Sequence, residues 1–153
     1  MYTKDSKPIL RKKDTKTNSL KKIYKTHPVK EMLSIPSFTM NHKNPYNFAD
    51  FDSQFEKVVE IYNAWGSSEC SQTEGNPRPI QGSGEGSIHA VKDGSIRAAL
   101  QKNCRFGFIA GGYDDRGIYD GLFDANQTQY SPGLTAVLAK DHSRSSMIEA
   151  LQK

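Results

Sequence analysis

The sequence predicts an α/β fold, and three short apolar runs carry most of that prediction. Residues 58–64, 105–110 and 134–139 are nearly continuous apolar segments, a pattern typical of strands buried on both faces of a parallel sheet. Apolar residues at helical spacing over 87–102 and 143–152 predict helices between and after these strands. The order strand, helix, strand, strand, helix favours a largely parallel sheet covered by helices.

A further strand is expected before these three. The apolar, β-prone stretch 33–42 runs toward the turn signal at Asn44 and Pro45, so His42 is expected near a strand end. Ser143 directly precedes the last predicted helix and is placed to cap it.

Basic charge is concentrated at the front of the chain. Residues 1–30 hold ten of the 21 Lys and Arg residues and two Asp residues, a balance of +8, whereas residues 31–153 hold 11 basic and 15 acidic residues, a balance of -4. The front segment has few apolar residues to bury. We therefore expect residues 1–30 to be a tail or a weak helix, and residues 31–153 to form the α/β domain.

Two classes of protein are disfavoured by composition. No apolar run approaches the roughly 20 residues of a membrane span, and the N-terminus has no apolar core of a signal peptide. We therefore expect no membrane association and a cytoplasmic location. Cys70 and Cys104 lack a metal-type spacing, so reduced thiols are expected.

Polar side chains follow three of the predicted strands. His42 follows the first, Glu69 the second, and Asp114, Asp115 and Arg116 the third. Ligands of parallel α/β folds bind at the carboxyl ends of the strands. A histidine with carboxylates there could hold a divalent metal ion, which polarises a phosphoryl oxygen and activates water.

Ordinary interpretations of the same residues stay open. His42 could be an exposed loop histidine, Asp114 and Asp115 could form turns, and Glu69 could be a helix cap or a solvated carboxylate. The pattern of residues alone does not decide between these interpretations and a metal site.

Four blocks give the chain a resemblance to a known family. They read VEIYNAWGSSE over 59–69, GNPRPI over 75–80, GFIAG over 107–111 and GLTAVLA over 133–139. Their order and spacing resemble a branch of the PHP (polymerase and histidinol phosphatase) superfamily, over about residues 35–153. The resemblance implies a distorted (β/α) barrel that binds two or three metal ions, often Zn, Mn or Fe, and hydrolyses phosphate esters.

The same resemblance implies an incomplete site. PHP proteins carry a His-x-His pair on their early strands, and this chain has none, so the N-terminal strands of the barrel are expected to be missing. His42 falls where this branch places a histidine after a strand. The family's Asp-x-His ending is replaced by Tyr113, Asp114 and Asp115, which makes independent activity doubtful.

The leading hypothesis is a fragment of a metal-dependent hydrolase, inactive or incomplete alone. His42, Asp114 and Asp115 would hold Zn or Mn, Glu69 and Arg116 would be catalytic, and Arg78 would bind a small anionic substrate such as a phosphate ester.

Two other hypotheses remain. The chain could be a degenerate, non-enzymatic protein, or its basic front segment could bind a polyanion. Nucleic acid is an unlikely partner, because Tyr2 and Tyr24 are the segment's only aromatic residues. Self-association through an uncovered sheet edge is also expected.

Overall fold

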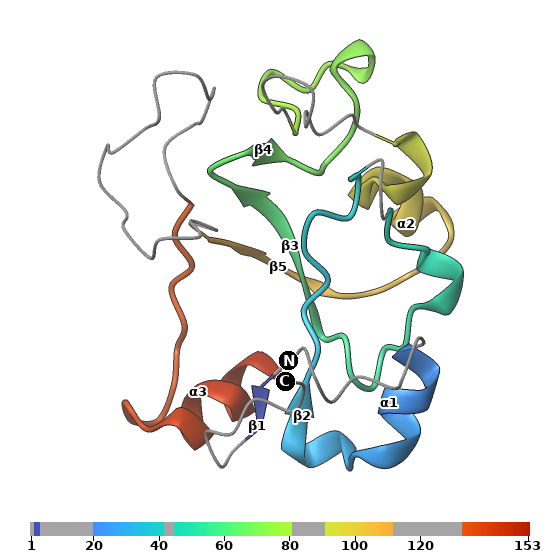
Figure 1. Ribbon diagram of the computed structural model, residues 1–153. Helices are drawn as coiled ribbons and strands as arrows, with labels where there is room; N and C mark the ends of the chain where they lie inside the picture. Colours follow the sequence, from blue (N-terminus) through green and yellow to red (C-terminus); the bar gives the residue numbers. More distant parts are fainter. Residues whose placement is uncertain (1, 4–19, 42–44, 81–90, 112–132) are drawn as a thin grey trace, which may run out of the picture.

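The computed structural model describes residues 2–3, 20–41, 45–80, 91–111 and 133–153 (Figure 1). Its strands are β1 (Tyr2–Thr3), β2 (Met32–Leu33), β3 (Val58–Asn63), β4 (Gly66–Ser67) and β5 (Gly107–Ala110). Its α-helices are α1 (Leu20–Thr26), α2 (Ile96–Gln101) and α3 (Arg144–Leu151). Single 3₁₀ turns lie at Val29–Glu31, Phe48–Asp50, Gln72–Glu74 and Lys92–Gly94.

The main sheet is small, open and mixed. Its strand order is β4-β3-β5, with β3 parallel to β5 and antiparallel to β4. The α/β class and strands within 58–64 and 105–110 are thus confirmed, but only β3 is largely buried. The expectation that 105–110 is a buried strand is wrong, because Gly107 and Phe108 of β5 are exposed and Ile109 and Ala110 are half-buried. The expectation of a largely parallel sheet is corrected, because a two-residue turn at Ala64 and Trp65 folds β4 straight back on β3. The described residues form an open sheet of three strands here, and no closed barrel.

The first expected strand is much shorter than predicted. The described strand here is β2, which pairs antiparallel with β1 and includes Met32 and Leu33. Of the predicted stretch 33–42, residues 34–41 are described and lie in no named strand. The chain that follows lies along β3 through single hydrogen bonds, such as the one from Glu60 N to Pro36 O at 3.0 Å. Pro36 lacks an N–H group and so cannot continue a regular ladder.

The prediction of a buried strand at 134–139 is wrong. These residues are extended but belong to no strand, and Leu134 and Leu138 are 91% and 99% exposed. The segment contacts β5 through a side chain instead of a backbone ladder: Thr135 Oγ1 accepts a hydrogen bond from Ala110 N at 2.7 Å and donates one to Ala110 O at 2.8 Å. An apolar composition alone could not reveal that this run has no covering layer among the described residues.

The two later helices have well-defined starts. Ser143 Oγ accepts a hydrogen bond from Ser146 N, which confirms the predicted cap of α3. Of the helix predicted over 87–102, residues 87–90 lie outside the described part of the chain. In the described part, α2 begins at Ile96, because Ser95 caps it by accepting a hydrogen bond from Ala98 N at 3.1 Å. Capping residues have extended backbone dihedrals, so the helix cannot continue backward through Ser95.

Helix α1 is part of the folded body. Its Tyr24 ring stacks on Phe55 with ring centroids 4.4 Å apart, and Ile23 and Met32 complete this small core. Beneath it, the fully buried Glu56 carboxylate accepts hydrogen bonds from the hydroxyl groups of Tyr24 and Tyr46, each at 2.6 Å. Residues 20–26 of the basic front segment are therefore helical and packed.

Two further clusters cover the faces of the sheet. On one face, Val59 packs with Phe48, Ile96 and Ala99, which come from the 3₁₀ turn and α2. On the other face, Val58 packs with Leu33 and with Ile148 of α3. The sheet therefore lies between α2 and α3, and its strand ends are the places left for polar groups.

Candidate functional site

Glu69 lies on the turn after β4, where neighbouring serines shape the backbone. Ser67 Oγ accepts a hydrogen bond from Glu69 N at 3.1 Å. The Glu69 carboxylate is half exposed and pairs with Arg97 of α2, with 3.1 Å between Oε1 and Nη2. Exposed ion pairs contribute about 0–1 kcal/mol, so this contact orients Glu69 more than it stabilises the fold.

Arg78, the predicted substrate-binding residue, belongs to the same loop system as Glu69. Its carbonyl oxygen accepts from Ser67 N at 2.7 Å, its N–H donates to Asn76 Oδ1 at 3.0 Å, and the residue is exposed. The buried Asn76 amide also donates to Cys70 O at 2.7 Å. The backbone at Arg78 is thus held firmly beside the turn that carries Glu69.

Four of the predicted site residues lie outside the described part of the chain: His42, Asp114, Asp115 and Arg116. Their described neighbours are nevertheless informative. In the sequence, Asp114 comes three residues after Gly111, which directly follows β5.

The carboxyl end of β5 is where the chain leaves the sheet and returns to it. Gly111 N donates to Tyr62 O of β3 at 3.0 Å, and Gly133 N donates to Gly111 O at 3.0 Å. Both anchors of the segment between Gly111 and Gly133 therefore lie at the carboxyl edge of the parallel pair β3 and β5.

A buried carboxylate, Glu60 of β3, lies at this edge and was missed by sequence reasoning. The residue is only 6% exposed, and its Oε2 accepts a hydrogen bond from Asn63 Nδ2 at 3.0 Å. Its Oε1 faces Gly111 so closely that a Cβ atom there would lie 3.0 Å away. The signal was present in the sequence: a glutamate inside an apolar strand is rarely buried without a partner or a task.

The environment of Glu60 disfavours its charged form. Burial raises the pKa of Glu60 above the ordinary 4.5, against smaller lowering effects of hydrogen bonds from Asn63 and Ser37. None of the ion pairs among the described residues includes Glu60. A buried carboxylate that has a raised pKa and no cationic partner within the described ranges is a typical functional-site candidate.

This environment predicts a specific pH dependence of stability. The folded state binds the Glu60 proton more tightly than the unfolded state does. The stabilisation that protonated Glu60 gives to the folded state is therefore fully present below about pH 4.5 and is lost as the pH rises through the folded pKa. The unfolding free energy of Glu60→Gln minus that of the natural chain should therefore increase from pH 4 to pH 8. Urea unfolding at several pH values measures it. Glu149→Gln, at an exposed pair with Lys153, should show no such trend.

The described residues do not by themselves fit a metal site. No group of three or more His, Cys, Asp or Glu side chains that could hold a metal ion occurs within the five described ranges. Glu60 supplies one carboxylate, and Glu69 is engaged by Arg97. A metal site would need His42, Asp114 and Asp115 in addition.

Within the described ranges, no helix has the length and apolar character needed to cross a membrane.

Sequence comparison finds relatives in chlamydiae. An uncharacterized protein of Chlamydia trachomatis serovar D is 50% identical over 151 residues, and similar proteins of Chlamydia muridarum and Chlamydia pneumoniae are 49% and 47% identical. Each alignment covers 99% of this chain but only 24% of the relative, so the chain spans about a quarter of their length. No family model matches the chain, and no solved structure matches it. The chain is thus similar to one quarter of much longer chlamydial proteins.

Proposed function

We propose that the chain contributes part of a metal-dependent hydrolase site for a phosphate ester or a related anion, and that it is incomplete as an enzyme by itself. One observation carries the proposal: the buried Glu60 carboxylate lies at the carboxyl edge of the parallel pair β3 and β5, where the chain leaves toward Asp114 and Asp115. This edge is where parallel α/β folds bind their ligands. The resemblance to PHP proteins points to the same chemistry.

Each proposed residue has a role suited to its chemistry. His42, Asp114 and Asp115, joined by Glu60, would hold Zn²⁺ or Mn²⁺ through imidazole and carboxylate donors. When bound, such an ion supplies a Lewis acid and a water of lowered pKa.

The remaining roles concern the substrate. Arg116 and Arg78 would face the anion, because guanidinium groups bind phosphate oxygens in pairs. Glu69 would act on a proton only after releasing Arg97, its present partner at 3.1 Å.

A metal titration of the full chain tests the proposal. After chelation, calorimetric titration with Zn²⁺ or Mn²⁺ should show binding, and Glu60→Gln should weaken it at least about tenfold, or roughly 1.4 kcal/mol. The glutamine keeps the size of the side chain and removes the charge. His42→Ala should have an effect of the same order.

Two histidines provide the matched controls. His142 is exposed and next to the N-cap of α3, and His89 lies away from the predicted strand ends in the sequence, so His142→Ala and His89→Ala should change the affinity little. Less than a tenth of an equivalent of metal bound to the natural chain, or equal affinities for all variants, would refute the proposal.

A further inference from the structure

Among the described strands, β5 pairs with β3 alone, so it is an edge strand with one side free of a described partner strand. Gly107 N and Gly111 N donate to Lys57 O and Tyr62 O at 2.8 and 3.0 Å. Because successive residues of a strand direct their backbone polar groups to opposite sides, Phe108 and Ala110 direct theirs away from β3. Thr135 already binds both groups of Ala110. The N–H and C=O of Phe108 therefore face outward along an open strand edge.

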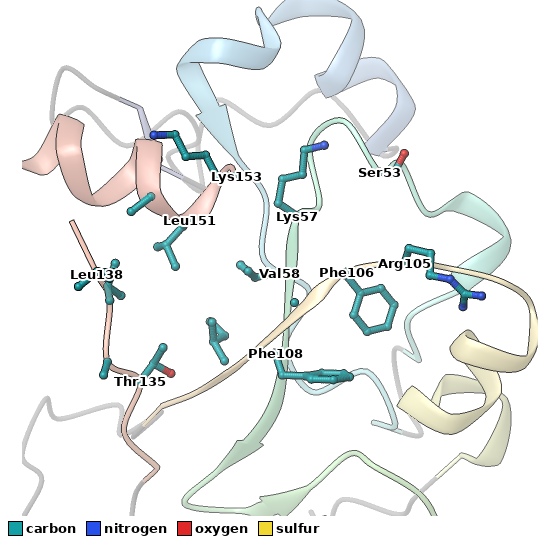
Figure 2. Close-up of a pocket in the computed structure, with 15 residues that line it drawn as sticks. Ser53, Lys57, Val58, Arg105, Phe106, Phe108, Thr135, Leu138, Leu151 and Lys153 are labelled. Carbon is teal, nitrogen blue, oxygen red and sulfur yellow. The ribbon is translucent and has the colours of Figure 1, made fainter. Parts of the chain in front are cut away.

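An open groove lies beside this edge. It has a volume of about 660 Å³ and is bounded by β5, by the extended segment 135–138 and by the end of α3. Figure 2 shows Val58 at its centre, Leu138 and Leu151 on one side and Phe108 on the other. The segment 133–138 meets β5 at Gly111 and then diverges from it (Figure 1). The groove thus has apolar side chains at its centre and on both sides, and it is open along the strand edge.

The charged side chains of the groove all have one sign. Lys57, Arg105 and Lys153 line it, and its lining includes no carboxylate side chain. Lys57 and Arg105 take part in none of the described ion pairs. Lys153 pairs with Glu149 at an exposed position. A second copy of the chain would bring the same three cations to the edge, which disfavours edge-to-edge pairing of two copies.

The exposed side chains around the groove favour an extended occupant over a small molecule. Leu134 and Leu138 are almost fully exposed and Phe108 is half exposed, whereas small-molecule sites enclose most of their ligand. Strand addition to a free edge uses main-chain hydrogen bonds for affinity and alternate side chains for specificity.

We propose that the edge of β5 binds an extended polypeptide segment with alternating apolar and acidic residues, which adds a strand beside Phe108. Its apolar side chains would pack on Val58 and Leu151, and its carboxylates would face Lys57, Arg105 and Lys153. This inference does not depend on the proposed hydrolase function.

The test uses the full chain and a synthetic peptide of four valine–glutamate repeats with blocked ends. Fluorescence anisotropy should show saturable binding, and hydrogen exchange at the Phe108 amide should slow at least tenfold. The Ala110 amide should change little, since Thr135 already accepts its hydrogen bond. In an extended peptide, alternate backbone amides point to opposite edges. N-methylation of the amides on one edge should leave the affinity unchanged, whereas N-methylation of the amides on the other edge should reduce it at least tenfold.

Charge variants separate the groove from the rest of the basic surface. The combined variant Lys57→Glu, Arg105→Glu and Lys153→Glu should bind at least tenfold more weakly. The matched variant Lys22→Glu, Lys25→Glu and Lys102→Glu has the same net charge at exposed positions outside the groove lining and should bind like the natural chain. Circular dichroism confirms that both variants fold.

Several outcomes would overturn the proposal. They are absence of binding at millimolar peptide, equal weakening by the two charge variants, indifference to methylation on both edges, and an unprotected Phe108 amide in the complex. Slow exchange of Phe108 that depends on protein concentration without peptide would assign the edge to a second copy instead.

Discussion

Replacing Glu56 with alanine should lower the free energy of unfolding by about 3 kcal/mol. The buried carboxylate accepts hydrogen bonds from Tyr24, from Tyr46 and from Asp52 N at 2.8 Å. Removing it leaves three donors without this acceptor, and each buried bond contributes about 1 kcal/mol net. Because these donors come from three separate parts of the chain, α1 should also detach from Phe55.

Conservative variants at the same cluster separate hydrogen bonding from packing. Burial and the neighbouring carboxylate raise the pKa of Tyr46, which keeps its hydroxyl group protonated as a donor. Tyr46→Phe removes this one donor and should cost only about 1 kcal/mol. Glu56→Gln keeps an acceptor and should fall between the two. Urea unfolding followed by circular dichroism measures all three, and a loss below about 0.5 kcal/mol for Glu56→Ala would contradict the assigned role.

Replacing Gly66 with alanine should also lower the free energy of unfolding by about 3 kcal/mol. Gly66 has a φ of 122°, which L-residues rarely adopt. An added Cβ atom would lie 2.7 Å from the Pro79 carbonyl carbon and 2.9 Å from Ile80 N. Backbone strain and overpacking each cost about 1–3 kcal/mol, and both apply here because the obstructing atoms belong to the backbone.

Gly75 is the matched control for this prediction. Its φ is 93°, but no atom lies within 4 Å of the position a Cβ would take. Gly75→Ala should therefore cost about 1 kcal/mol, the conformational part alone. Equal losses for the two variants in urea unfolding would show that the close approach of Gly66 to Pro79 is unimportant.

The prediction from sequence succeeded for features that local pattern sets, although β5 is not buried as expected. The apolar runs around Val58 and Phe108 form strands, and they pair in parallel because a helix-containing crossover connects them. Ser143 begins α3 as expected, since a serine before an apolar-periodic run caps a helix through its own hydroxyl group. Such features depend on residues close in the chain.

The candidate site was only partly accessible to sequence reasoning. Glu69 lies on the predicted turn after the second strand, yet its carboxylate contacts Arg97, 28 residues away, which no local pattern indicates. Glu60 was passed over because an apolar run was treated as core throughout. Its place in the candidate site depends on Gly111, the residue after β5, lying against its carboxylate.

The sequence by itself determined the α/β class, the two parallel strands, the closing helix with its cap, and the uneven charge, because each follows from residue type and short-range spacing. Only the tertiary structure decided which apolar segments are covered. Leu138 and Val59 have similar hydrophobicity, but β3 is enclosed between two layers, whereas Leu138 of segment 133–138 is almost fully exposed and the segment is held at the end of β5 by the hydrogen bonds of Gly133 and Thr135. Burial is a property of what packs against a residue, and that depends on long-range contacts.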